Sequence, residues 1–413
     1  ALGLKPWMTK PATKAVLEVL IAKGGPDCVR FVGGCVRNAI LNRKIDDIDL
    51  ATPLTPPSVV KALEAAGLKA IPTGIEHGTV TALSDGQTFE ITTLRKDVQT
   101  DGRHAVVVFT DDWAEDAARR DFTMNALYAD PSGAVFDPSG TGVEDARAGR
   151  LVFVGDPKTR IDEDYLRILR YFRFLAWYGK GEPDRDALAA CETGRALLAD
   201  CSAERVAKEM LKLLAADDPR PALRLMASTG VLAQVLPQAE GLAVLDRLVT
   251  IEDEQLFENE PLLRLAALLP ADPATGEALG RALRLSNAAR ERLVQALGTE
   301  PRLVSWMSPK AARQAVYRLG NAVFHDRVKL HWARSLRPAT TPQWRGLLAL
   351  GESWHAPVMP ISGKDVVGSG VPAGPLVGEV LREVEDWWVD SDFIDDKLSL
   401  VERLKSVAQG LAF

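Results

Sequence analysis

The 413-residue sequence has no long apolar run, few cysteines and few histidines, and each shortage argues against a class of protein. No stretch approaches the roughly eighteen apolar residues of a membrane-spanning helix, so no membrane association is expected. The opening residues, ALGLKPWMTKPATK, lack the apolar core of a secretory signal. The four cysteines form no CxxC pair, which disfavours a zinc knuckle or a disulfide framework. We therefore expect a cytoplasmic protein with reduced thiols.

The five histidines include one His-Asp pair, His325-Asp326, whereas a metal-dependent phosphohydrolase module of the HD type needs several histidines. We interpret the pair as a chance occurrence. Hydrophobic residues (46%) and charged residues (26%) stand in the proportions of an ordinary globular protein. The length predicts two to four domains.

The net charge of −6 argues against a general nucleic-acid binder, but basic residues gather in one window, residues 301–350. Its only acid is Asp326. Such a bias is typical of a surface that binds a phosphate backbone, and a helical surface balanced by neighbouring acids is the alternative. The bases are Arg302, Lys310, Arg313, Arg318, Arg327, Lys329, Arg334, Arg337 and Arg345.

The most informative stretch is residues 31–52, FVGGCVRNAILNRKIDDIDLAT. An apolar strand-like run stops at Gly33-Gly34, a turn whose backbone N–H groups are free to approach a triphosphate. Farther on, Asp47 and Asp49 alternate on one face of a predicted strand, where the two carboxylates repel unless a cation lies between them. Mg²⁺ prefers such oxygen ligands. An ordinary turn and a solvated strand end are the alternatives for each feature alone.

In this order, the stretch resembles motif A of the class II nucleotidyltransferases, the family of tRNA CCA-adding enzymes and bacterial poly(A) polymerases. The chain departs from the family pattern, GGxVRD followed by DxDxxT, at Asn38, where the family usually has Asp. The resemblance implies that Gly34 and Arg37 bind the nucleotide and that Asp47 and Asp49 are catalytic ligands of Mg²⁺. The matching residues are Gly33, Gly34, Val36, Arg37, Asp47, Asp49 and Thr52.

Three strand-like runs follow, around residues 69–72, 79–83 and 88–94. In the last run, Glu90 is expected beside the Asp47/Asp49 strand as a third catalytic acid, as in the family. A solvent-facing glutamate is the alternative. The polar residues 95–113 predict a mobile loop centred on Asp101–Arg103.

Residues 114–128, AEDAARRDFTMNALY, are predicted to form a helix, followed by a short strand at residues 151–154. The segment resembles the family's RRDFTxNA motif. By that match Arg120 binds the triphosphate, with Asp121 and Asn125 as supporting residues. A charged helix surface is the alternative.

A helix predicted from Asp162 onward carries Asp164, Arg167, Arg170 and Arg173 at steps of three. This resembles the family motif EDxxRxxRxxRF, which implies that Asp164 and Arg167 meet the Watson–Crick edge of the incoming base. Asp offers acceptors and Arg a planar fork of donors, so the pair suits C or A. Arg170 and Arg173 are expected to hold the helix and the phosphates.

Helical periodicity continues to the end of the chain, where residues 363–378 contain a GKD…G…GPxxG segment. The bacterial members of the family carry a similar segment, which implies a tail that touches tRNA. The predicted tRNA-binding residues are Arg302, Lys310, Arg313, Arg327, Lys329 and Lys364.

Together these features predict an α+β fold: a nucleotidyltransferase head with a mixed sheet (residues 1–149), a helical neck with the base-reading helix (150–216), a helical body (217–300) and a helical tRNA-binding tail (301–413). The resemblance implies transfer of CMP and AMP from CTP and ATP to the 3′ hydroxyl of tRNA, with release of pyrophosphate.

Three alternative functions remain open at this point, as does the oligomeric state. A poly(A) polymerase is disfavoured because residues 74–80 match the CCA-adding form of that strand entry. Enzymes that add only CC or only A are a second alternative, and the loop at Asp101–Arg103 disfavours CC-only addition. The third alternative is an inactive RNA-binding scaffold, which would not need the catalytic and base-reading residues together.

Overall fold

The computed structural model describes all residues except 101–103, 336, 338–339, 395 and 412–413. The chain divides into two compact units, Ala1–Pro237 (unit 1) and Gln238–Phe413 (unit 2). The finer division into head, neck, body and tail stays a prediction. Among the described residues, no helix is both long enough and apolar enough to cross a membrane.

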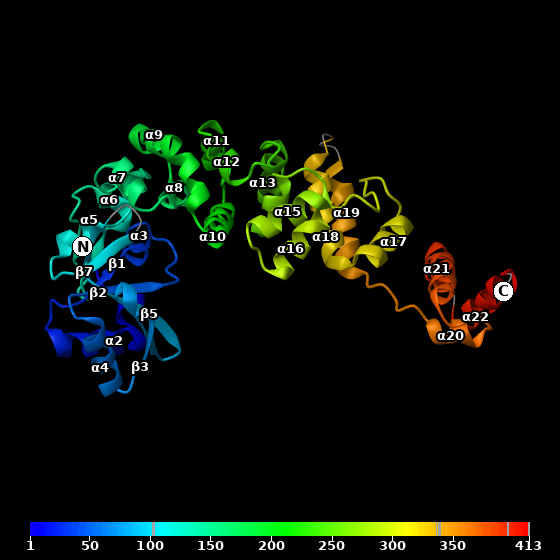
Figure 1. The fold of residues 1–413 in the computed structure, drawn as a ribbon, viewed down its shortest axis with the longest axis horizontal. Helices are drawn as coiled ribbons and strands as arrows, with labels where there is room; N and C mark the ends of the chain where they lie inside the picture. The colour runs from blue at the N-terminus through cyan, green and yellow to red at the C-terminus, as the bar shows by residue number, and fades with distance from the viewer. Residues whose placement is uncertain (101–103, 336, 338–339, 395, 412–413) are drawn as a thin grey trace. The chain divides into compact units, whose positions relative to one another are not determined.

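A mixed sheet lies in unit 1, with strand order β3-β4-β5-β2-β1-β8-β9 (Figure 1). β2 and β5 are parallel, whereas β1–β2 and β4–β5 are antiparallel. Between β4 and β5, Asp85 and Gly86 both have positive φ (49° and 75°), as a type I′ hairpin turn requires. The strands are β1 Arg30–Val32, β2 Ile48–Thr52, β3 Lys69–Gly74, β4 Thr79–Ser84, β5 Gln87–Thr93, β8 Tyr128–Ala129 and β9 Val135–Phe136, and a separate pair is β6 Arg95–Thr100 with β7 His104–Phe109.

Helices surround this sheet and continue beyond it within unit 1, which confirms the predicted α+β class. Proline at the first turn starts several of them, where its missing N–H costs no hydrogen bond. The helices are α1 Pro6–Thr9, α2 Pro11–Gly24, α3 Gly34–Ile40, α4 Pro56–Ala65, α5 Trp113–Ala118, α6 Gly142–Ala148, α7 Pro157–Glu163, α8 Arg167–Tyr178, α9 Arg185–Gly194, α10 Ala203–Leu214, α11 Arg220–Ser228 and α12 Val231–Val235.

Alternation along β2 and β5 gives the sheet two chemically different faces. Ile48, Leu50 and Phe89 point into an apolar core that includes residues of α2 and α4. Asp49 and Glu90 alternate with these residues and lie on the opposite face, side by side in the parallel register. The two carboxylates are therefore kept away from the apolar core.

The predicted helix over residues 114–128 is wrong beyond Ala118, where α5 ends. Oδ1 of Asp121 accepts the backbone N–H of Phe122 (2.7 Å), which removes that N–H from a helical ladder. The two arginines between α5 and Asp121 consequently lie on a turn.

The predicted mobile loop over residues 95–113 is also wrong, because β6 and β7 pair as an antiparallel hairpin. The polar composition of the segment obscured its valines at positions 98 and 106–108, which favour strands. The predicted centre of the loop, Asp101–Arg103, lies outside the described residues. The strand predicted at residues 151–154 reduces to a single bridge between Phe122 and Phe153.

The single helix predicted from Asp162 onward is two helices, and Asp164 lies between them. Oδ1 of Asp164 accepts the N–H of Leu166 (3.1 Å), a local bond that turns the chain. Arg167 then opens α8. Asp164 therefore occupies a helix junction instead of a helical face.

Unit 2 consists of helices in its described residues, as the periodicity predicts, although their ends are shifted (Figure 1). Its last helices enclose a small core of their own around Val384, Trp388, Leu400 and Leu404. The helices are α13 Ala243–Gln255, α14 Pro261–Ala267, α15 Pro273–Ala282, α16 Asn287–Ala296, α17 Pro309–Leu319, α18 Asn321–Arg334, α19 Thr341–Ser353, α20 Gly363–Gly368, α21 Pro375–Asp390 and α22 Lys397–Gln409.

Candidate active site

A cavity of about 820 Å³ in unit 1 brings together residues from α3, β2, the turn after α5, α8 and α10. Its volume is that of an ordinary small-molecule site. Many of its side chains are basic, so it suits a strongly anionic ligand. Of the predicted site residues, it is lined by Gly34, Arg37, Asp49, Arg120, Asp164, Arg167, Arg170 and Arg173.

The predicted metal acids lie where β2 and β5 pair. Asp49 is beside Glu90 in the register, and Asp47 comes one residue before β2. Burial, together with the Glu90 and Asp47 carboxylates, raises the pKa of Asp49 to about 6. No Lys or Arg of the described residues forms an ion pair with any of the three. Asp49 and Glu90, adjacent in the register, and Asp47, two residues before Asp49, supply carboxylate oxygens of the kind that a divalent metal prefers.

The double glycine forms the turn from β1 into α3. Gly33 has φ 75° and ψ −127°, a backbone conformation that a residue with a Cβ rarely adopts. Gly34 begins the helix and lines the cavity beside the guanidinium of Arg37. The turn therefore brings backbone, without side chain, to the cavity wall.

Arg37 is buried and is held by uncharged acceptors. Its guanidinium donates to Oδ1 of Asn125, to Oη of Tyr178 (2.7 Å) and to Oδ1 of Asn38 (3.1 Å). It also lies over the Tyr178 ring, 4.1 Å from the centroid. The amide of Asn38 donates to the carbonyl of Lys44 (2.9 Å), a bond that a carboxylate cannot donate. Asn38 thus helps to orient Arg37 without neutralising its charge.

Sequence reasoning missed Asp116, whose side chain is 1% exposed and anchors the arginine turn. Its carboxylate accepts from Arg119 (3.1 Å), Arg120 (3.1 Å), Tyr128 Oη (2.6 Å) and the N–H of Arg95 (3.1 Å). Although burial alone would raise the pKa of Asp116, Arg120 and Arg119 hold it below its ordinary value. The only sequence signal was its position three and four residues before the two arginines.

The arginines of α8 are also paired. Arg170 contacts Asp121 (2.7 Å), which keeps the pKa of that buried carboxylate low despite its burial. Arg173 contacts Glu209 of α10 (3.1 Å), a residue that sequence reasoning did not identify. These pairs connect α8 to the arginine turn on one side and to α10 on the other.

The predicted base-reading pair, Asp164 and Arg167, lies in the cavity wall. The backbone N–H of Arg167 donates to the carbonyl of Asp164 (3.0 Å), but their side chains bond other residues. Asp164 forms an ion pair with Arg205 (2.8 Å). Arg167 bonds Glu163 (2.7 Å) and the carbonyl of Arg119 (3.1 Å). Both side chains are therefore oriented by neighbours from outside the pair.

The predicted tRNA-binding residues, all in unit 2, fall into two groups. Arg327 and Lys329 are each 4% exposed: Arg327 donates to backbone carbonyls, including that of Gln295 (2.7 Å), and Lys329 contacts Glu260 (3.3 Å). Arg313 is paired with Asp392 (2.6 Å). Because their donors serve the fold, we do not assign these three to a nucleic-acid surface. Arg302, Lys310 and Lys364 are exposed.

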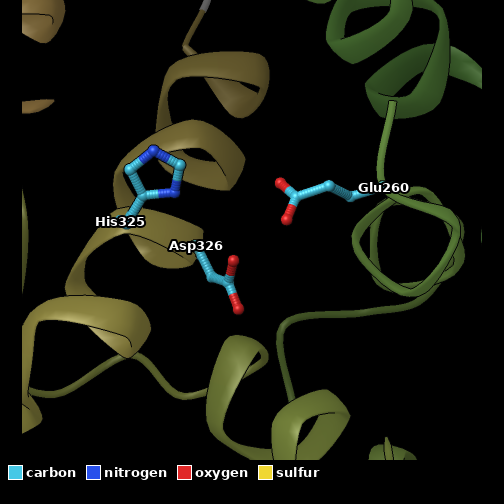
Figure 2. Close-up of side chains that lie close together, drawn as sticks. All are labelled: Glu260, His325 and Asp326. Atoms are coloured by element: carbon cyan, nitrogen blue, oxygen red, sulfur yellow. The ribbon is translucent and has the colours of Figure 1, made fainter. Parts of the chain in front are cut away.

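One further cluster of possible metal ligands lies in unit 2, where Glu260, His325 and Asp326 have ligand atoms within 4.8 Å of one another (Figure 2). Its acids already have cationic partners: Arg292 contacts both Glu260 (2.7 Å) and Asp326 (3.0 Å), and Lys329 contacts Glu260. We interpret the cluster as an ion-pair network that joins α14, α16 and α18.

Comparisons with known proteins give consistent matches. Residues 29–152 match the family described as the poly(A) polymerase head domain, and residues 182–242 match a probable RNA- and SrmB-binding site of polymerase A. Over 396 residues the chain is 32% identical to the mitochondrial CCA tRNA nucleotidyltransferase 1 of Mus musculus, covering 94% of this chain and 89% of that protein. It is 31% identical to the CCA-adding enzyme of Geobacillus kaustophilus, covering 89% and 90%. The solved CCA-adding enzyme of Bacillus stearothermophilus in complex with CTP is similar with a TM-score of 0.77 and 28% identity, covering 98% of this chain and 100% of that chain.

The Asp116 network predicts a stability effect. Asp116→Ala leaves two partly buried arginines without their buried carboxylate, and breaking a buried pair costs about 3–5 kcal/mol. Urea unfolding should show this loss. Glu115→Ala is the matched control, since its partner Lys96 is 49% exposed and exposed pairs contribute about 0–1 kcal/mol. Equal stability of the two variants would contradict the anchoring role.

Proposed function

The chain belongs to the CCA-adding enzyme family of nucleotidyltransferases, and on that premise we propose that it adds the CCA end to tRNA. It transfers CMP and AMP from CTP and ATP to the terminal 3′ hydroxyl and releases pyrophosphate. The observation that carries the proposal is the cavity in unit 1, which is lined by arginines from several elements and by Asp49 of β2. The family membership predicted from the sequence is confirmed by these relatives.

Enzymes of this family generally use a divalent metal, and we propose Mg²⁺ held by Asp47 and Asp49 with Glu90 beside them. The fit rests on the three neighbouring carboxylates and the raised pKa of Asp49. When bound, the metal supplies charge neutralisation at the ribose hydroxyl and at the leaving pyrophosphate. The protein itself presents these oxygen ligands from the paired strands β2 and β5 and from the residue before β2.

The triphosphate is bound by the basic wall of the cavity. Arg120 and Arg37 face it, and both are oriented before a ligand arrives, Arg120 by Asp116 and Arg37 by Asn125. The N–H groups at the Gly34 end of the glycine turn supply further donors. Pre-orientation matters because charged side chains that are already ordered lose little entropy on binding.

The base is read by Asp164 and Arg167. Asp164 supplies acceptors for the exocyclic amino group that C and A carry and that U lacks. Arg167 supplies donors for the ring nitrogen and carbonyl acceptors. Arg170 and Arg173 hold α8 through their ion pairs with Asp121 and Glu209.

We propose that three exposed basic residues of unit 2 bind the tRNA: Arg302, Lys310 and Lys364. Exposed bases attract a phosphate backbone without losing a structural role. A cytoplasmic location stays a prediction.

One assay tests the function and its alternatives. The purified protein is offered tRNA ending at each of its three immature lengths, with CTP and ATP singly and together. We expect C addition to the two shorter ends and A addition to the CC end. A long A tract would instead identify a poly(A) polymerase, and addition of one nucleotide type alone would identify a partial enzyme. Absence of any addition would contradict the proposal.

The acids of β2 give the first prediction for catalysis. Asp49→Ala should leave folding intact and lower nucleotide addition by about 1000-fold, the scale of losing metal-based charge stabilisation. Single-turnover addition of CMP measures the loss. Asp46→Ala is the control, since Asp46 is exposed and its ion pair among the described residues is with exposed Lys44. Near-normal turnover of the Asp49 variant would remove the assignment.

Base selection gives the second prediction. Asp164→Ala should narrow the kcat/KM preference for CTP over UTP and for ATP over GTP by about 10- to 1000-fold, from roughly 1–4 kcal/mol of unmatched hydrogen bonding. Catalysis with the correct nucleotides should fall less than in Asp49→Ala. The control is Asp162→Ala, whose carboxylate pairs with exposed Lys158. If all four nucleotides slow equally, Asp164 does not read the base.

The revised basic surface gives the third prediction. Changing Arg302, Lys310 and Lys364 to Glu should weaken tRNA binding and make its salt slope shallower by about 1 per lost phosphate contact. Arg281→Glu is the control, because Arg281 is exposed and lies outside the basic window. Filter binding over a salt series measures both quantities. A slope equal to that of the wild type would mean that these residues contact no phosphate.

A further inference from the structure

The Asp164 carboxylate is fixed by two donors that come from different parts of unit 1. Oδ1 accepts the N–H of Leu166 (3.1 Å) at the junction of α7 and α8. Oδ2 accepts from the guanidinium of Arg205 (2.8 Å), which belongs to α10. Both Asp164 and Arg205 line the cavity, and their side chains are 35% and 52% exposed. The first bond is local, whereas the second depends on how α10 packs.

The capping and packing of α10 fix the position of Arg205 relative to Asp164. Ser202 caps its start by accepting the N–H of Arg205 (3.3 Å). Val206 and Met210 are buried, and α10 packs on α8. Glu209, one turn after Arg205, contacts Arg173 of α8 (3.1 Å). Helix α10 therefore supplies a positive charge to Asp164 through Arg205 and a negative charge to Arg173 through Glu209.

We propose that Arg205 is a specificity-determining positioning residue: it holds the Asp164 carboxylate in the orientation that distinguishes C and A from U and G. The inference rests on the proposed function, in which Asp164 meets the base.

The chemistry allows Arg205 and the base to share the carboxylate. Each carboxylate oxygen has two acceptor sites, so Oδ2 can accept from Arg205 and from an amino N–H of the base together. C and A present an exocyclic amino group, whereas U and G present a carbonyl oxygen at the matching position. An acceptor fixed in place repels that oxygen, but a carboxylate that rotates freely can turn away from it. Losing Arg205 therefore relaxes discrimination, while the metal acids and the triphosphate arginines stay in place.

The experiment measures kcat/KM for CTP, UTP, ATP and GTP on tRNA lacking its end. Arg205→Ala should lower the CTP/UTP and ATP/GTP preferences by about tenfold, a usual size for coupling between contacting residues. Arg205→Lys should recover part of the preference, because an ammonium keeps the charge but not the planar fork. In the Asp164→Ala background, removing Arg205 should change the preferences no further.

Lys208→Ala is the matched control, because Lys208 lies on the same helix and lines the same cavity. Among the described residues it forms no ion pair with Asp164. Its loss should leave the preferences unchanged. Equal effects of the Lys208 and Arg205 variants would overturn the inference in favour of general charge.

Failure of the inference and failure of the proposed function give different results. If Asp164→Ala relaxes selectivity and Arg205→Ala does not, the inference is wrong and the base-reading role of Asp164 stands. If Arg205→Ala slows all four nucleotides equally and lowers the melting temperature, Arg205 is structural only and the inference is wrong. If Asp164→Ala leaves the preferences intact, base reading by Asp164 fails and the inference fails with it.

Discussion

Buried carboxylates hold the arginines of the cavity in place, and the arrangement of unit 1 depends on these pairs. Guanidinium groups crowded around one cavity repel one another, most strongly where water is scarce. Asp116 does not line the cavity, whereas its partners Arg119 and Arg120 do. The carboxylate thus binds the arginines from the protein side and leaves other N–H donors directed to the cavity. The same carboxylate accepts the N–H of Arg95, so it also fixes the start of β6 in the β6–β7 hairpin.

The acidic face of the sheet at β2 and β5 has the opposite arrangement. Asp49 and Glu90 are neighbours in the β2–β5 register, and no described Lys or Arg forms an ion pair with either. Burial, and after it the nearby carboxylates of Glu90 and Asp47, raises the pKa of Asp49. The site therefore has cationic donors available for phosphates, and Asp49 lines the same cavity with Glu90 beside it in the sheet. A nucleoside triphosphate with a divalent metal satisfies both sets of residues at once.

The sequence allowed prediction of the fold class, and its compact motifs contain Asp49, Arg120 and Asp164, which line one cavity and whose roles stay predictions. It did not predict Asp116, Arg205 or Tyr178, which orient arginines and Asp164 of that cavity. Arg205 is 41 positions from Asp164, and Tyr178 is 141 positions from Arg37. Such pairs exist only after helices have packed, so no spacing in the chain reveals them. Two errors in the predicted elements have local causes instead, because side-chain bonds at Asp121 and Asp164 favour turns where the periodicity continues a helix.

The basic window of unit 2 illustrates the same limit for charge. Counting residues along the chain gives a large local excess of positive charge, yet several of these basic side chains bond other groups of the protein. Arg313 pairs with Asp392 and Arg318 with Glu385, residues of the acidic end of the chain. Arg327 donates to the backbone carbonyls of Gln295 and Glu300, which carry no negative charge. Burial therefore lowers the pKa of Arg327. Only basic residues whose side chains remain exposed attract a phosphate at a distance. The charge of an ion-paired residue is largely neutralised by its close partner. A surface able to bind a phosphate backbone is therefore identified from the exposure and partners of its basic residues, because their number in a window overstates the available charge.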